Sequence, residues 1–248
     1  KNSIIKNYDL EKYLSQYKKE GWTKFEKFID KELIDNCQDT ILNLFKKYSK
    51  DIFINQSSSL INNFELHRRI IDLRKKDKTK FAKIYDILQT SITVKNIASN
   101  KRLIELACKI LKTKKTSLML RNTVIRIDVP NDKRNTLNWH YDMYSLKNPN
   151  HLPKGGISMV IPFTQFSTEN GCPELCIGSH KEKPKQKYSK KSEYESETFS
   201  ISSDYINKFE KIHLTAEPSD LIGFPMSTVH KSGFNSSDTI RVCAIIRY

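Results

Sequence analysis

The hydrophobic pattern of the chain changes near Ser117, and this change limits the folds open to it. Before Ser117, apolar residues recur every three or four positions, which predicts amphipathic helices. After it, β-branched residues alternate with polar ones in short runs set off by Gly, Pro, Asn or Ser, which predicts short strands. We therefore expect a mostly helical part over residues 1–115 and a β part over residues 116–248.

The individual elements follow from capping residues and from the length of each run. Asp9 and Asp30 are suited to start helices, and Gly21 is suited to end the first one. Further helices are predicted at 64–73, 78–89 and 100–112, and strands at 117–130, 156–163, 174–177, 220–225 and 239–246. Short strands separated by turns favour a β-sandwich or barrel over a βαβ sheet.

A chain of 248 residues, 38% of them hydrophobic, can bury a sizeable core as one domain, and we expect a single domain over 1–248. The run 181–211 is polar and charged, so we expect it to be a long surface loop inserted between two core strands. Loops of this length are often lids over a site, and disorder is the alternative interpretation.

The formal net charge is +15, from 43 basic and 28 acidic residues. A basic balance attracts nucleic acids, anionic membranes or acidic substrates. The lysines are scattered and form no recognised nucleic-acid motif, so solvated faces are the favoured explanation and an anionic small substrate the main alternative. We expect no nucleic-acid partner.

The sequence contains no apolar run of 18 residues and shows no signal peptide, so we expect no membrane span. Its five cysteines are odd in number and irregularly spaced, which does not indicate a disulfide framework or a zinc site. A cytoplasmic location is the resulting expectation.

The residues that carry chemistry begin with His140 and Asp142. In an extended strand alternate side chains share a face, so the side chains of His140 and Asp142 project toward the same place. Trp139 and Tyr141 then lie on the opposite face. A further histidine, His230, ends a later apolar run. Two histidines and one carboxylate on one face of a metal leave three coordination positions open, which suits non-haem Fe(II) that must bind a co-substrate and O2.

Arg241 lies eleven residues after His230, beyond the turn "SGFNSSD". An antiparallel return can bring its guanidinium to the metal pocket, where a planar fork of donors suits the distal carboxylate of 2-oxoglutarate. Ser232 can add a hydroxyl donor to the same carboxylate.

Four segments together resemble the phytanoyl-CoA dioxygenase family of Fe(II)/2-oxoglutarate-dependent oxygenases. They are "YKKEGWTKFEKFIDKELID", "WHYD", "FTQFSTENGCPELCIGSHK" and "HKSGFNSSDTIR", and they span nearly the whole chain. The resemblance implies a double-stranded β-helix (a jelly-roll, cupin-like core) with N-terminal helices packed on it, so the expected fold class is mainly β with flanking α.

The resemblance also implies a set of roles. Iron is bound by His140, Asp142 and His230, and 2-oxoglutarate chelates it while pairing with Arg241 and Ser232. No catalytic residue is expected beyond the metal ligands. The histidine of "GSH", His180, is implied to be structural or to lie near the pocket, and not to be a ligand. Because Asp142 is kept, the site does not resemble the halide-binding variant in which a small residue replaces that carboxylate.

The predicted activity is a dioxygenase that hydroxylates an unactivated carbon of a small metabolite, releasing succinate and CO2. Two alternatives stay open. One is a metal-containing jelly-roll protein that binds without turnover, since fold alone does not decide function. The other is the same iron chemistry with a different outcome, namely desaturation, epimerisation or ring formation.

Overall fold

The computed structural model describes residues 9–49, 63–142, 155–182, 184–189 and 198–248. The N-terminal elements are α1 (Leu10–Glu20), β1 (Thr23–Phe25), α2 (Lys31–Tyr48), α3 (Phe64–Lys76), α4 (Lys78–Gln89), α5 (Ile92–Ile97), α6 (Lys101–Leu111) and η1 (Lys115–Ser117). The C-terminal elements are β2 (Asn122–Asp128), β3 (Ile157–Pro162), β4 (Glu174–Cys176), η4 (Ser179–Lys181), β5 (Lys187–Ser189), β6 (Thr198–Ser200), α7 (Ser203–Ile206), β7 (Lys211–His213), β8 (Leu221–Pro225), β9 (His230–Lys231) and β10 (Arg241–Arg247).

The first helix begins and ends at the residues that its sequence predicts. The carboxylate of Asp9 accepts a hydrogen bond from the N–H of Lys12 at 3.3 Å. Gly21 ends the helix with φ of 80°, a left-handed conformation that glycine adopts without a Cβ penalty. Asp30 also stands at a helix start, but its carboxylate binds Arg102 at 2.9 Å instead of capping α2.

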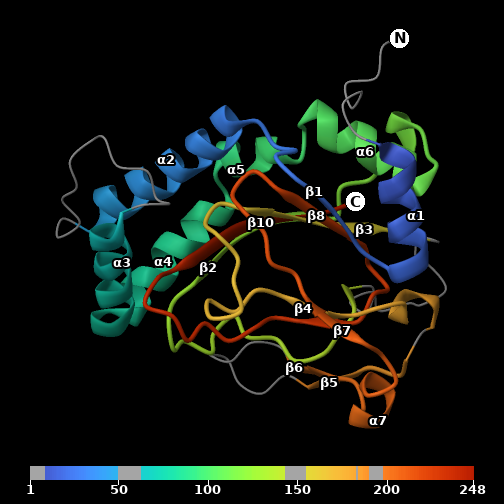
Figure 1. Ribbon diagram of the computed structural model, residues 1–248. Helices are drawn as coiled ribbons and strands as arrows, with labels where there is room; N and C mark the ends of the chain where they lie inside the picture. The colour runs from blue at the N-terminus through green and yellow to red at the C-terminus, as the bar shows by residue number, and fades with distance from the viewer. Residues whose placement is uncertain (1–8, 50–62, 143–154, 183, 190–197) are drawn as a thin grey trace.

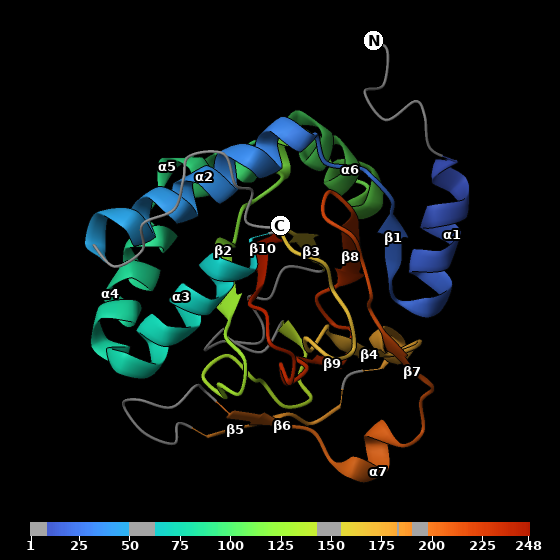
Figure 2. The same ribbon diagram turned by 60° about the vertical axis from the view of Figure 1, so that its left-hand side comes forward.

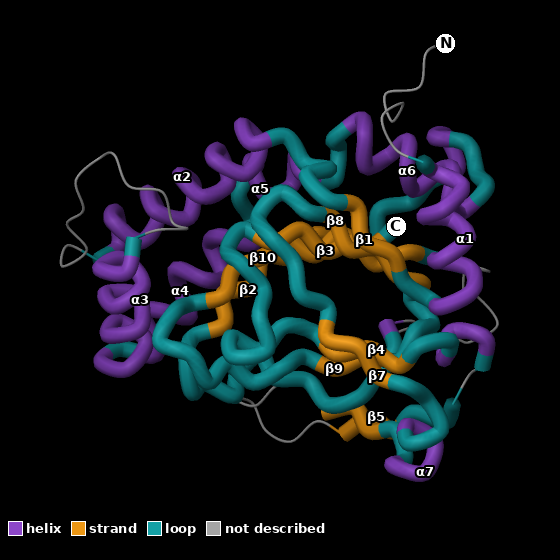
Figure 3. Tube along the Cα trace, viewed as in Figure 1, coloured by secondary structure: helices purple, strands orange, loops and turns teal. Residues whose placement is uncertain are grey.

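Two antiparallel sheets and the separate two-stranded pair β5–β6 form the β part of the chain (Figure 3). The larger sheet has the strand order β1-β8-β3-β10-β2, and the smaller one has the order β7-β4-β9. The predicted strand 117–130 is shorter in the structure, because β2 begins only at Asn122 and the residues before it form η1 and an extended link.

The helices cover the outer face of the larger sheet, as Figures 1 and 2 show from two directions. Alternate side chains of the sheet, such as Ile125, Met159 and Ala244, belong to the same buried cluster as the helical residues Phe45 and Phe81. The opposite side chains, including Val160, Phe224 and Cys243, form a second cluster with Leu175 of the smaller sheet. The fold is therefore mixed α/β with antiparallel sheets, and helices make up the N-terminal part, where the sequence predicts them.

The described residues of the insertion at 181–211 include regular secondary structure, whereas the sequence predicted a long surface loop. It forms the hairpin β5–β6 and the short helix α7, on the side of the molecule away from the helical layer (Figure 2). Ile201 and Ile206 are buried with Val229, and Trp139 and Tyr141 pack against them. These apolar contacts anchor the insertion to the segment that carries His140.

No helix in the described part of the chain is both long and apolar enough to cross a bilayer.

Candidate metal centre

His140 and His230 lie directly opposite each other in a short antiparallel pairing. The N–H of each residue donates to the carbonyl of the other, at 2.9 and 2.8 Å. Residues opposite each other in an antiparallel pair project their side chains to the same side. The two imidazole centroids are accordingly 4.3 Å apart. The extended strand expected around His140 is thus a single bridge, yet it is enough to bring the two histidines together.

Each imidazole is oriented by a backbone carbonyl two residues before it. His140 Nδ1 donates to the carbonyl of Asn138 at 2.7 Å, and His230 Nδ1 donates to that of Thr228 at 3.0 Å. A proton on Nδ1 leaves the lone pair of a neutral ring on Nε2, which is the arrangement found in histidines that bind metals.

The carboxylate of Asp142 is held from two sides. Arg247 forms a bidentate pair with it, Nε to Oδ2 at 2.8 Å and Nη2 to Oδ1 at 3.0 Å. The hydroxyl of Ser158 donates to Oδ2 at 2.5 Å. Burial raises the pKa of Asp142, but Arg247 and the nearby His230 outweigh it, so that the pKa lies well below its usual range. The group is therefore an oriented anion.

Among the described residues, one group of His, Cys, Asp and Glu side chains has ligand atoms close enough to share a metal ion, and it consists of His140, Asp142 and His230. The three ligand atoms lie within 4.8 Å of one another, and His140 Nε2 is 3.9 Å from Asp142 Oδ1. Neighbouring donors in a metal-bound set are about 3 Å apart, so these side chains have to close by about 1–2 Å around an ion.

The ionisation states also suit a metal. Burial, reinforced by His230, lowers the pKa of His140 to about 3. Burial lowers the pKa of His230 as well, against the opposing charge of Asp142. Both rings are therefore neutral near pH 7 and need not lose a proton to bind a cation. Two neutral imidazoles and one carboxylate are the donor set that fits non-haem Fe(II).

The aromatic neighbours separate into two groups. Phe224 packs on His230 with ring centroids 4.8 Å apart, so it borders the ligand set. Trp139 and Tyr141 lie on the opposite side, in the cluster that anchors the insertion, as expected from their alternation with the ligands. Tyr144, the next aromatic residue along the chain, lies outside the described residues.

Gln186, in the insertion, binds the backbone of the residue between two of the proposed ligands. Its Oε1 accepts from the N–H of Tyr141 at 2.7 Å, and its Nε2 donates to the carbonyl of Tyr141 at 3.4 Å. The side chain is buried. It takes the place that a neighbouring strand would otherwise occupy.

Arg241 and Ser232 both belong to a buried polar network on the inner face of β2 and β10. Arg241 donates to Asp128 from Nε at 3.2 Å and from Nη2 at 2.5 Å, and its Nη1 donates to the carbonyl of Gly171. Ser232 accepts from Arg126 at 2.8 Å. The guanidinium of Arg241 therefore binds the carboxylate of Asp128, and this partner was not predicted from the sequence.

The motifs around "NGC" and "SGF" meet backbone to backbone. Gly171 has φ of 76°, and a Cβ on it would lie 2.7 Å from the carbonyl oxygen of Gly233. A Cβ on Gly233 would in turn lie 2.6 Å from the carbonyl oxygen of Cys172. The glycines are required for this approach, which places the carbonyl of Gly171 against Arg241.

The "GSH" motif supports the segment before His230. The hydroxyl of Ser179 accepts from the N–H of Val229 at 2.9 Å and donates to the carbonyl of Cys176 at 2.8 Å. His180 points elsewhere: its Nε2 donates to the carbonyl of Lys18 at 3.0 Å, beside Gly21. These contacts are structural, as the resemblance implied for His180.

Arg247, Ser158 and Gln186 were missed in the sequence. A signal existed for the first two, because each is a polar residue inside an apolar strand, and Arg247 shares a strand face with Arg241. Gln186 lies in a polar run and offers no such contrast.

Two facing antiparallel sheets that enclose two histidines and one carboxylate define the class of non-haem metal-dependent oxygenases. The chain belongs to the phytanoyl-CoA dioxygenase family, whose sequence model matches residues 17–243. No curated protein matches the chain in sequence.

Solved structures of similar fold include enzymes of nogalamycin biosynthesis. The epimerase SnoN, in complex with Fe3+, alpha ketoglutarate and nogalamycin RO, superposes with a TM-score of 0.63 at 13% identity, covering 96% of this chain and 82% of that one. The alpha ketoglutarate-dependent carbocyclase SnoK gives 0.62 at 13%, covering 98% and 84%. EctD from S. alaskensis with bound Fe gives 0.62 at 15%, covering 95% and 75%. At these identities the likeness is one of fold.

Proposed function

We propose that this protein is a non-haem Fe(II)- and 2-oxoglutarate-dependent dioxygenase that hydroxylates an unactivated carbon of a small molecule, releasing succinate and CO2. The whole chain 1–248 acts as one oxygenase domain in this proposal. Its two facing sheets are the walls of a double-stranded β-helix, a jelly-roll of the cupin-like kind, with the helices packed outside.

One observation carries the proposal: the ligand atoms of His140, Asp142 and His230 lie within 4.8 Å of one another, with both imidazoles tied at Nδ1. Family membership gives this set its chemical context. SnoN and EctD, which share the fold, were crystallised with iron, and SnoN also with alpha ketoglutarate.

Iron held by these three residues would supply the oxidising chemistry, with 2-oxoglutarate and O2 as its co-substrates. The protein's part is to hold its ligands in place. Arg247 and Ser158 fix the carboxylate of Asp142 so that Oδ1 faces His140, and Phe224 shields His230 from water. Preorganised ligands of this kind lose little freedom when the ion binds.

For the co-substrate, Arg241 and Ser232 are the proposed partners of the distal carboxylate. Both are buried on the inner face of the fold, in one polar network. A retained cationic anchor favours a catalytic protein over one that only binds metal, because a site without turnover has no use for a co-substrate.

The test is 2-oxoglutarate turnover by purified protein with Fe(II) and O2, read as succinate formed. A candidate primary substrate should raise the rate above the uncoupled level. His140→Ala should abolish succinate formation. Wild-type protein that binds Fe(II) but forms no succinate with any 2-oxo acid would instead identify a non-catalytic metal protein.

A second candidate function differs only in the outcome of the oxidation, which is epimerisation or ring formation instead of hydroxylation. It is favoured because SnoN is an epimerase and SnoK a carbocyclase. Product mass separates the possibilities. Hydroxylation adds one oxygen atom to the substrate, epimerisation leaves its mass unchanged, and desaturation or ring formation removes two hydrogen atoms.

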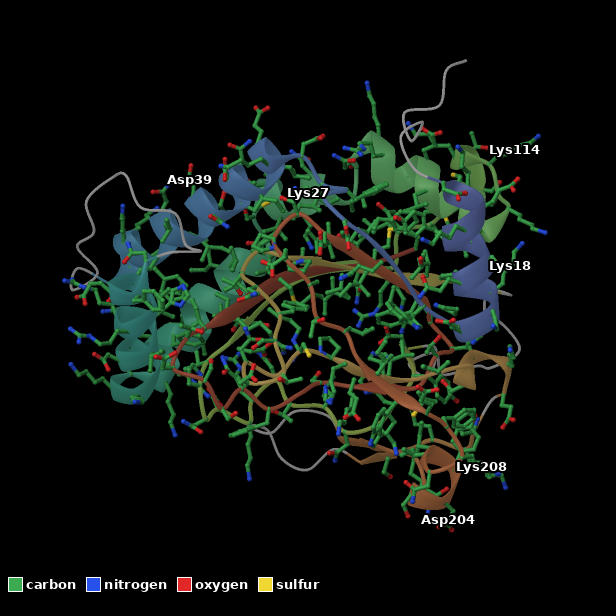
Figure 4. All side chains as sticks on the ribbon, viewed as in Figure 1. Lys18, Lys27, Asp39, Lys114, Asp204 and Lys208 are labelled. Atoms are coloured by element: carbon green, nitrogen blue, oxygen red, sulfur yellow. The ribbon has the colours of Figure 1, made fainter. Side chains whose placement is uncertain are left out.

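A small anionic substrate fits the net charge of +15, which attracts anions at long range. In Figure 4, Lys18 and Lys114 lie on the right, Lys27 near the top centre and Lys208 at the bottom. This spread favours a small anion over a nucleic acid, which needs a continuous basic face. All five cysteines are free, which suits a reducing compartment such as the cytoplasm.

A further inference from the structure

A buried cluster of charges lies on the inner face of β2 and β10. Asp128 and Arg241 are directly opposite in register, and Arg126 is opposite Cys243. Asp128 binds both guanidiniums, Arg241 Nη2 at 2.5 Å and Arg126 Nη2 at 3.1 Å. The side chains of Arg241, Asp128 and Arg126 are 2%, 8% and 14% exposed. These charges are therefore largely withdrawn from water.

The cluster has one positive charge in excess, because two guanidiniums face one carboxylate. Its other hydrogen-bond partners among the described residues are neutral, namely the hydroxyl of Ser232 and the carbonyls of Asn135 and Gly171. Burial raises the pKa of the Cys243 thiol to about 11 and that of Tyr85 to about 12, so neither neighbour supplies a negative charge near pH 7. A buried unbalanced charge is unfavourable, and an anion that entered here would relieve it.

Arg126 has an N–H group that can donate a further hydrogen bond. Its Nε is buried and has no hydrogen-bond partner among the described residues. Arg241, by contrast, already directs Nε and Nη2 at Asp128 and Nη1 at Gly171. A buried N–H without a partner loses its hydrogen bonds to water and forms none in the protein, which is energetically unfavourable. This is a further reason to expect an acceptor at this position.

Arg126 is also close to the metal set. Its Nη1 donates to Ser232, two residues after His230, at 2.8 Å. The donor of Arg126 therefore lies in the region that a co-substrate bound at the metal has to reach.

We propose that Arg126 is a second cationic anchor for the distal carboxylate of 2-oxoglutarate, acting beside Arg241 and Ser232, and that Asp128 positions both guanidiniums. This inference rests on the proposed function. The incoming carboxylate balances the cluster at two positive and two negative charges. The site is thus specific for dicarboxylic 2-oxo acids, and a 2-oxo acid that ends in a methyl group leaves the excess charge unpaired.

The experiment measures binding without turnover. Protein loaded with Mn(II) is titrated calorimetrically with 2-oxoglutarate and with 2-oxopentanoate, which has a methyl group where 2-oxoglutarate has its distal carboxylate. The measured quantity is the ratio of the two dissociation constants. Arg126→Gln should reduce the wild-type preference for 2-oxoglutarate by about tenfold or more, since a charge-assisted hydrogen bond to a carboxylate is lost. Affinity for 2-oxopentanoate should change little.

Arg74→Gln is the matched control. The side chain of Arg74 is 15% exposed and pairs with Asp132 at 2.5 Å, so its substitution also removes a largely buried ion pair. Arg74 binds Asp132 and not Ser232 in the described part of the chain, so the preference should stay at the wild-type value. If Arg126→Gln does not fold, Arg126→Lys keeps the charge without the fork and should reduce the preference partially.

Three results decide the matter. A reduced preference in Arg126→Gln, with Arg74→Gln unchanged, supports the anchor. An unchanged preference in Arg126→Gln, or an equal loss of affinity for both acids, overturns it and leaves Arg241 as the anchor. Wild-type protein that binds neither acid, or binds both equally, contradicts the proposed function itself and removes the basis of the inference.

Discussion

The proposed ligands are held in two different ways, and this predicts how substitutions near them act. His140 and His230 are oriented by carbonyls of their own segments, which a side-chain substitution elsewhere does not remove. Asp142 is oriented by side chains that come from other strands, Ser158 on β3 and Arg247 on β10. The carboxylate is therefore the ligand whose position depends most on its neighbours.

Removing any one ligand should abolish tight metal binding. We expect His140→Ala, Asp142→Ala and His230→Ala each to lose bound iron on gel filtration, because two remaining donors do not form the facial set. The metal content of the eluted protein is the measurement. His180→Ala is the control and should retain iron, since His180 binds the carbonyl of Lys18. If a variant keeps a full equivalent of iron, the residue substituted in it is not a metal ligand.

Arg247→Met should weaken metal binding without removing a ligand. Loss of a partner that orients a metal ligand typically lowers affinity by about ten- to a hundredfold. Mn(II) titration followed by electron paramagnetic resonance measures the effect. Arg102→Met, which removes the ion pair with Asp30 on the helical side, should leave the affinity unchanged. Equal affinities in wild type and Arg247→Met would show that Asp142 does not need this support.

The low pKa of His140 predicts a loss of stability in acid for the metal-free protein. In the unfolded chain a histidine takes up a proton near pH 6.5, whereas burial keeps His140 neutral in the fold down to about pH 3. Between these values the unfolded state binds more protons, so the free energy of unfolding falls as the pH falls through this window. Urea unfolding at pH 7.5 and 5 should show a smaller loss for His140→Asn than for wild type. Equal losses would mean that His140 is protonated in the fold.

At the scale of elements, local signals predicted the helices well and the shortest strands poorly. The helix at 78–89 has the predicted bounds, and that at 100–112 differs only by its capping residues. The two- and three-residue strands β9, β5, β6 and β7 were missed, because alternation has no meaning over so few residues. The positions of β7 and β9 also depend on pairing with β4, which is distant from both in sequence.

The same limit applies to the candidate site. The ligand pattern could be predicted because His140 and Asp142 are two residues apart and the later motif has a fixed spacing. The pairing of Arg241 with Asp128 could not be predicted, because it depends on the register of β10 against β2. Spacing along one segment is local information, whereas register between segments is tertiary.

Gln186 should act on the metal site through the backbone that it binds. Gln186→Met removes both hydrogen bonds to Tyr141 while keeping a side chain of similar size. We expect faster hydrogen exchange at the Tyr141 amide and a several-fold loss of Mn(II) affinity, because the segment between His140 and Asp142 loses its partner.

Gln89→Met is the matched control for this prediction. Gln89 binds the backbone of Ile125 in the same two-point manner, donating to its carbonyl and accepting from its N–H, both at 2.9 Å. Its loss should lower global stability by about 1–3 kcal/mol and leave Mn(II) affinity unchanged. If the two variants bind Mn(II) alike, Gln186 is a structural residue only.

At the scale of the whole molecule, the proposed metal joins segments that are distant in sequence and lie in different sheets. His230 belongs to the smaller sheet, whereas Asp142 is tied through Arg247 and Ser158 to the larger one. An ion between them therefore links the two sheets at their inner faces. Helices α2 to α6 pack on the outer face of the larger sheet, so they do not replace this link.

Metal binding should accordingly raise the stability of the fold as a unit. A ligand that binds only the folded state at a thousand times its dissociation constant adds about 4 kcal/mol, which raises the melting temperature of a chain of this size by roughly 8–16 °C. Calorimetric scans with and without Mn(II) measure the shift, and EDTA should reverse it. His140→Ala should melt at one temperature in both conditions, because it cannot form the link. A similar shift in that variant would place the stabilising ion elsewhere in the protein.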